Sequence, residues 1–161
     1  ILNGGLKKWI FENKPITKLT TKIIDSNYVA NEKENLVVSF DQIKKNILSK
    51  SFNVIDARSL ERFEGKVSEP RKGLRSGHIQ NSFCLPFNQC INQKTGEFKN
   101  LEELRELFNQ NENIEKRLDQ VFTCGSGVTA AVLAYAYKMV NNDYIPKIYD
   151  GSWSEYGKYP A

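Results

Sequence analysis

The stretch Gln120-Val121-Phe122-Thr123-Cys124-Gly125-Ser126-Gly127-Val128-Thr129-Ala130 decides the fold. An apolar run ends at Cys124, a Gly-Ser-Gly sequence follows, and a long apolar segment over 129–140 begins directly afterwards. A short apolar run, a glycine turn and a longer apolar segment indicate a strand, a loop and a helix. We therefore predict a β-strand that ends at Cys124 and a helix over 129–140.

The glycines around Cys124 point to chemistry. Gly125 and Gly127 lack a Cβ, so the backbone can curl and turn successive N–H groups toward the sulfur. The start of the following helix adds partial positive charge, which favours a thiolate. A cysteine in an apolar setting can also be inert, but packing alone explains a Gly-Ser-Gly turn poorly. We interpret Cys124 as a nucleophile, with Gly125, Gly127, Val128 and Thr129 forming the loop that binds the substrate.

Two classes of enzyme use a cysteine in such a loop. Cysteine phosphatases need an arginine six residues after the cysteine to bind the phosphoryl oxygens, but Ala130 stands at that position. The shorter loop suits a thiolate that attacks sulfur and then carries a persulfide, whose negative outer sulfur the N–H groups stabilise. The sequence therefore indicates sulfur transfer.

The segment 124–130 resembles the active-site loop of the 3-mercaptopyruvate sulfurtransferases, members of the rhodanese superfamily. Thiosulfate-using relatives usually carry Arg and Lys where this chain has Gly125 and Ser126. That basic pair suits a dianionic donor, so Gly-Ser favours mercaptopyruvate. The resemblance covers 36–161, and together with the alternating apolar segments it implies an α/β fold, a rhodanese-like parallel sheet with helices on both faces.

A carboxylate and an arginine follow another predicted strand. The apolar run 52–56 ends at Asp56, and in a parallel sheet this places Asp56 at the same edge as the cysteine loop. Asp56-Ala57-Arg58 resembles the family's Asp-x-Arg signature. We interpret Asp56 and Arg58 as a charged pair that braces loops near the site, in preference to a catalytic pair.

A basic segment rich in Gly and Pro, 61–77, is expected to lie over the site. Mercaptopyruvate carries a carboxylate, and guanidinium groups bind carboxylates bidentately. By resemblance, Arg62 and Arg71 match the two arginines to which the family's carboxylate binding is ascribed. The alternative is that both are solvated surface side chains. Glu64 departs from relatives that often carry a basic residue there.

The other reactive side chains are interpreted as structural. His78 belongs to a Gly-His-Ile-Gln sequence that resembles a family turn, and Cys84 and Cys90 are expected to pack as small apolar residues. Three cysteines without paired spacing and a single histidine give no plausible metal set, so no cofactor is expected. A reducing compartment fits this cysteine usage, and the family resemblance implies a mitochondrial or cytoplasmic location.

Bulk properties exclude two further classes. No apolar run approaches the ~20 residues of a membrane span. The net charge of +4 comes from scattered Lys and Arg residues without interleaved aromatic side chains, so nucleic-acid binding is not indicated.

The chain of 161 residues suits one main domain, and its first part is interpreted separately. Asn3-Gly4-Gly5-Leu6 resembles Asp150-Gly151-Ser152-Trp153, a whole domain length later, which indicates a repeat. We therefore predict the tail of a preceding rhodanese-like domain over 1–16, an interdomain linker over 17–35, and a C-terminal catalytic rhodanese domain over 36–161. Chance similarity is the alternative.

The resemblance implies a mechanism. Arg62 and Arg71 hold mercaptopyruvate, the Cys124 thiolate attacks its sulfur, pyruvate leaves, and Ser126 assists proton transfer. The persulfide then passes its sulfur to a thiol acceptor such as thioredoxin, or to cyanide. Two alternatives stay open: a thiosulfate sulfurtransferase, and a non-catalytic rhodanese-like binding or scaffold module of a larger assembly.

Overall fold

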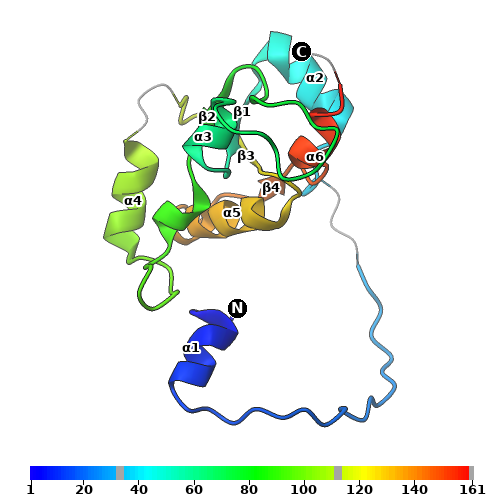
Figure 1. The fold of residues 1–161 in the computed structure, drawn as a ribbon, viewed down its shortest axis with the longest axis vertical. Coiled ribbons are helices and arrows are strands. Elements are labelled where there is room, and N and C mark those ends of the chain that lie inside the picture. Colours follow the sequence, from blue (N-terminus) through cyan, green and yellow to red (C-terminus); the bar gives the residue numbers. More distant parts are fainter. Residues whose placement is uncertain (32–34, 111–113, 160–161) are drawn as a thin grey trace.

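The computed structural model describes residues 1–31, 35–110 and 114–159. Its centre is a parallel four-stranded sheet in the order β2-β1-β3-β4 (Figure 1). The strands are β1 (Phe52–Asp56), β2 (Ser82–Cys84), β3 (Asp119–Thr123) and β4 (Lys147–Ile148). The predicted α/β architecture with a parallel sheet is confirmed.

The two central strands bury side chains on both faces, because successive residues of a strand point to opposite sides. On one face, Ile55 and Phe122 join the apolar core under α4 (Leu101–Asn109) and α5 (Val128–Val140). On the other face, Val54 and Val121 join the core formed with α2 (Phe40–Ser49) and α6 (Ser152–Tyr156). Helices therefore cover both faces of the sheet, as predicted.

Two helices begin at capping boxes. Ser39 and Gln42 exchange side-chain and backbone hydrogen bonds at the start of α2, and Asn100 and Glu103 do the same at α4. These bonds satisfy N–H groups that a helix start otherwise leaves without a partner. Between strands lie the short helix α3 (Leu60–Phe63) and the 3-10 helix η1 (Phe87–Cys90).

The carboxyl ends of β1, β2 and β3 meet at one edge of the sheet. Asp56 pairs with Cys84 on one side and with Thr123 on the other, and the Ala57 N–H group donates to the Thr123 carbonyl at 2.8 Å. Cys124 directly follows Thr123. The structure therefore places Asp56 next to the cysteine loop, where the sequence predicted it.

The first part of the chain lies apart from the sheet (Figure 1). Helix α1 (Gly5–Phe11) is followed by a segment, 12–31, without helix or strand. The Asn3 side chain accepts a hydrogen bond from the Phe98 N–H group at 2.9 Å, and Lys8 pairs with Glu97 at 3.0 Å. The predicted division at 16 and 35 stays a prediction, because these contacts do not distinguish a domain tail from a linker.

Candidate active site

Cys124 lies at the start of a tight loop between β3 and α5, and only 2% of the residue is exposed. Gly127 ends the loop in the left-handed region, at φ 80, and α5 begins at Val128, one residue before the predicted start. A Cβ at Gly127 would collide with the Asp150 carboxylate and would lie 3.2 Å from the Asp150 carbonyl oxygen. The left-handed backbone conformation therefore favours glycine at this position, and a Cβ would in addition displace the Asp150 side chain.

The loop stabilises a thiolate on Cys124. Burial acts to raise the pKa of this thiol, but hydrogen bonds to the sulfur outweigh it and bring the pKa below the ordinary value of 9.0. The donors are the Thr129 hydroxyl and the backbone N–H groups of Ser126, Ala130 and Thr129. The N–H donors to the sulfur lie mainly in the first turn of α5, and binding of a substrate anion by this loop stays a prediction.

The thiols of the other two cysteines have raised pKa values. Burial raises the pKa of the Cys84 and Cys90 thiols to about 12. The Cys84 thiol lies 3.7 Å from the Arg58 carbonyl oxygen, and Cys90 is fully buried in the core. Neither thiol is prepared for nucleophilic attack near neutral pH, which agrees with their interpretation as packing residues.

A buried serine from α6 holds the loop in place. The Ser152 hydroxyl accepts hydrogen bonds from the N–H groups of Cys124 at 3.2 Å and Gly127 at 3.0 Å. It donates to the Tyr149 carbonyl at 2.8 Å. This corrects one expectation, because the Gly127 N–H group points to Ser152 and not to the sulfur. A part for Gly127 in substrate binding stays a prediction.

Sequence reasoning placed Ser152 only in a Gly-Ser-Trp turn. Its partners lie 25 and 28 residues away along the chain, so no local pattern reveals them. Ser152 also adopts a positive φ of 50, which is unusual for a serine.

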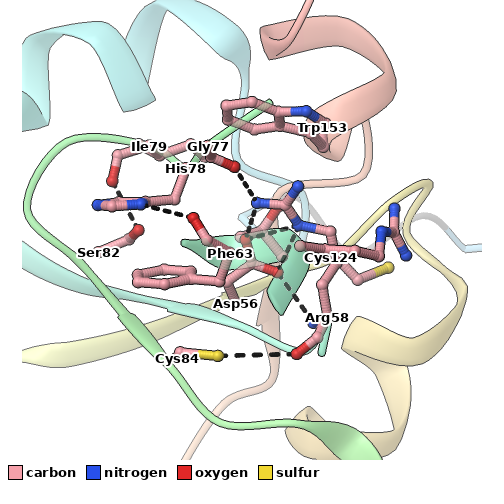
Figure 2. A network of polar contacts seen from close by, with 12 residues as sticks. Asp56, Arg58, Phe63, Gly77, His78, Ile79, Ser82, Cys84, Cys124 and Trp153 are labelled. Carbon is pink, nitrogen blue, oxygen red and sulfur yellow. Dashed lines mark hydrogen bonds and ion pairs between the residues drawn. The ribbon is translucent and has the colours of Figure 1, made fainter. Parts of the chain in front are cut away.

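The charged pair Asp56 and Arg58 is buried and fully engaged (Figure 2). The Arg58 Nε and Nη2 atoms donate to Asp56 Oδ2 at 2.9 and 2.6 Å, and Nη2 also donates to the Gly77 carbonyl at 2.8 Å. The guanidinium group lies 4.4 Å from the Trp153 ring centroid. These contacts join the end of β1 to the segment at Gly77, and the bracing role of the pair stays a prediction.

Glu69 extends this network toward the site, and sequence reasoning missed it. One carboxylate oxygen accepts from Arg58 Nη1 at 2.9 Å, and the other accepts from Arg62 Nη2 at 2.5 Å. Only 1% of the Glu69 side chain is exposed. A carboxylate so removed from water is stable here because both of its neighbours are guanidinium groups.

The two predicted carboxylate-binding arginines converge on Gly125. A Cβ placed on Gly125 would lie 3.1 Å from Arg62 Nη2 and 3.5 Å from Arg71 Nη1. Arg71 Nη2 donates to the Ser126 hydroxyl at 3.0 Å. The structure therefore brings Arg62, Arg71 and Ser126 together beside Cys124, and a side chain at position 125 would press on the guanidinium groups.

The remaining candidates lie at the margin of the site. Val128 is 73% exposed at the start of α5, whereas the Thr129 hydroxyl turns to the sulfur. The His78 ring stacks on Phe63 at 3.9 Å, and its Nδ1 lies 2.8 Å from the Phe63 carbonyl oxygen (Figure 2). These contacts give His78 a structural place next to α3.

Residues 1–31, 35–110 and 114–159 hold neither a metal-binding cluster nor a membrane-spanning helix. Within these ranges no three His, Cys, Asp or Glu side chains gather as a metal-ligand set. The same ranges contain no helix that is long and apolar enough to cross a membrane.

Comparison with known proteins gives a consistent result. Residues 39–159 match the model of the rhodanese-like domain family. Human 3-mercaptopyruvate sulfurtransferase is 35% identical over 156 residues, which are 97% of this chain and 52% of that protein. The mitochondrial thiosulfate/3-mercaptopyruvate sulfurtransferase 1 of Arabidopsis thaliana is 34% identical over an alignment 181 residues long. The alignment covers 99% of this chain and 47% of that protein.

A solved structure shows the same fold. SseA from Escherichia coli, described as having the rhodanese fold of 3-mercaptopyruvate sulfotransferases, superposes with a TM-score of 0.77 at 29% identity. The match covers 95% of this chain and 55% of SseA. The chain thus spans about half the length of the relatives that it matches.

Proposed function

This chain belongs to the rhodanese family, and we propose that it is a sulfurtransferase domain that moves the sulfur of 3-mercaptopyruvate through a persulfide on Cys124. One observation carries the proposal: a thiol with a lowered pKa lies in a loop on which two guanidinium groups converge. A thiolate beside a site for a carboxylate fits a small donor that carries both sulfur and a carboxylate. The names of the relatives support sulfur transfer as the reaction class.

In the proposed first step, Arg62 and Arg71 hold the donor carboxylate and the Cys124 thiolate attacks the donor sulfur. A sulfur–sulfur bond forms and the carbon–sulfur bond breaks, so the electron pair moves to the methylene carbon of a pyruvate enolate. The proton lost by the donor thiol balances the proton that this carbon gains. Ser126, which Arg71 holds at 3.0 Å, is the proposed relay for that proton.

The second step returns the enzyme to its starting state. The outer persulfide sulfur carries negative charge that the N–H groups of the loop stabilise. A thiol acceptor such as thioredoxin, or cyanide, attacks this sulfur, and the sulfur–sulfur bond breaks with its electrons returning to Cys124. The persulfide and the acceptors are parts of the proposal.

Thiosulfate is the second candidate donor. The cluster of arginines beside Gly125 supports binding of an anion, and the Arabidopsis relative is named for both donors. Mercaptopyruvate is favoured because Gly125 and Ser126 add no further cationic side chain for a dianion.

We also propose the wider context that the sequence indicated: a preceding rhodanese-like domain with its tail at 1–16, a linker at 17–35, and a mitochondrial or cytoplasmic location. Apolar side chains along the first part of the chain support a partner surface that covers them. The exposed ones are Ile1, Leu2, Leu6, Ile10, Phe11, Ile16, Leu19, Ile23, Ile24, Tyr28 and Val29.

Loading of Cys124 tests the proposed function. The protein is incubated with mercaptopyruvate, pyruvate release is followed, and mass spectrometry identifies the cysteine that gains one sulfur atom. We expect the adduct on Cys124, its loss in Cys124→Ser, and its retention in the matched variants Cys84→Ser and Cys90→Ser. An adduct at full level on Cys124→Ser defeats the assignment. Absence of any adduct favours the non-catalytic binding module.

A further inference from the structure

Glu69 lies between the bracing network and the candidate donor site. Its two oxygens bind Arg58 Nη1 at 2.9 Å and Arg62 Nη2 at 2.5 Å, and Arg62 Nε also donates to it at 3.2 Å. The Arg62 guanidinium group lies beside Gly125, and the buried Glu69 carboxylate already balances its charge.

Arg71 has a different partner. Its Nη2 donates to the neutral Ser126 hydroxyl, and the ion pairs found among the described residues do not include Arg71. The contacts run from Asp56 through Arg58 and Glu69 to Arg62, and Arg71 lies with Arg62 beside Gly125, so three guanidinium groups face two carboxylates. One net positive charge remains, and it lies on the arginine nearest to solvent. Asp150, an exposed carboxylate against Gly127, is outside this chain of contacts.

We propose that Glu69 is the residue that sets the donor charge which this site accepts, by limiting the cluster to one net positive charge. With the Cys124 thiolate present, a bound monoanion such as mercaptopyruvate leaves one negative charge unbalanced, and a dianion such as thiosulfate leaves two. This inference rests on the proposed function for its substrates. Glu69 acts through Arg62 and is a positioning and charge-setting residue, not a catalytic one.

The variant Glu69→Gln keeps the size of the side chain and adds one unit of positive charge to the cluster. At a separation of roughly 7 Å from the bound anion, an effective dielectric constant between about 20 and 80 gives about 3-fold to 50-fold stronger binding per unit of ligand charge. A dianion gains this factor twice and a monoanion once. The ratio of kcat/KM for thiosulfate to kcat/KM for mercaptopyruvate should therefore rise about tenfold. Damage to the fold lowers both rates and does not produce this rise.

In thiosulfate loading, the Cys124 thiolate attacks the outer sulfur, the sulfur–sulfur bond of the donor breaks, and sulfite leaves with the electron pair. Both donors thus give the same persulfide, and the ratio compares only how each anion is bound and aligned. Glu69→Asp retains the charge and should retain the wild-type ratio. Glu64→Gln removes an equal charge from an exposed pair with Lys66 and should leave the ratio within about twofold.

A second measurement needs no sulfur transfer. Iodoacetamide and iodoacetate alkylate a thiolate and differ by one negative charge, so the ratio of their rates at Cys124 reports the local potential. Glu69→Gln should raise the iodoacetate to iodoacetamide ratio about tenfold, and Arg71→Gln should lower it by a similar factor. Because Arg71 is exposed, its variant tests the charge balance even if Glu69→Gln fails to fold.

The outcomes separate the two hypotheses. Unchanged ratios in both measurements overturn the assignment of Glu69, whether or not the wild-type protein transfers sulfur. If the alkylation ratios change as expected but neither donor forms a persulfide, the charge balance is supported and the proposed function is refuted. Failure of every reagent and donor to reach Cys124 overturns both.

Discussion

Replacing Ser152 by alanine should loosen the cysteine loop without touching the sulfur. The change leaves the buried N–H groups of Cys124 and Gly127 and the Tyr149 carbonyl without their partner. A buried polar group without a hydrogen bond costs about 1–3 kcal/mol, and partial relaxation of the loop brings the expected loss of unfolding free energy to roughly 2–4 kcal/mol. For a chain of this length that corresponds to a melting temperature lower by roughly 4–16 °C.

The same change should make Cys124 less reactive. The Ser126, Thr129 and Ala130 N–H groups lower the thiol pKa only while the loop keeps them aimed at the sulfur. A rise of one pKa unit makes the thiolate about tenfold scarcer near neutral pH. The pH dependence of iodoacetamide alkylation measures this pKa, and thermal unfolding measures the stability of the same samples.

Two matched variants isolate the hydroxyl. Ser154→Ala removes a hydroxyl from the same helix whose partner is the Gly151 carbonyl at 2.9 Å, so it should leave the pKa of Cys124 unchanged. Ser152→Gly also removes the hydroxyl but relieves the positive φ of 50, which costs a non-glycine residue about 1–2 kcal/mol. It should recover stability and not reactivity. A Ser152→Ala protein that matches Ser154→Ala in both measurements would refute the reasoning.

Two further predictions concern the thiols and the donor site. The pH profile of Cys124 alkylation should have its midpoint below pH 9.0, because the pKa of this thiol is lowered. Cys84 and Cys90 in the denaturant-free protein should react only as the pH approaches about 12, and equal pH profiles by mass spectrometry would contradict this. Arg62→Lys and Arg71→Lys should raise KM for mercaptopyruvate and cost about 1–3 kcal/mol each, since lysine loses the bidentate geometry; unchanged kcat/KM in steady-state kinetics would place the carboxylate elsewhere.

The parts of this protein that follow from contiguous residues were predictable. The strand, glycine turn and helix around Cys124 form one uninterrupted pattern, and the run that ends at Asp56 has the length and composition of a buried strand. Both elements lie where their own residues indicated, except that β3 ends at Thr123, one residue before the predicted end at Cys124. The start of α5 was wrong by one residue because the left-handed conformation of Gly127 already completes the turn.

The contacts that tune the site were not predictable in the same way. Ser152 and Glu69 look like ordinary turn residues, and their roles depend on partners from other elements. Arg71 meets Ser126 across 55 residues of chain, and Arg58 meets Glu69 across 11. Only the packed structure determines which buried donor faces which buried acceptor. A weak signal did exist for Ser152 and Glu69, because Ser152 follows Gly151 and Glu69 precedes Pro70, and Gly and Pro mark turns.

Trp153 connects the two halves of the site. Its backbone N–H group donates to the Cys124 carbonyl at 3.0 Å, and its ring lies against the Arg58 guanidinium at 4.4 Å. Arg58 in turn fixes Glu69, which holds Arg62 over Gly125. The proposed nucleophile and the proposed carboxylate-binding arginine therefore share one anchor in α6. In the proposed reaction the distance between them must match the distance from sulfur to carboxylate in one small donor, and a shared anchor fixes that spacing.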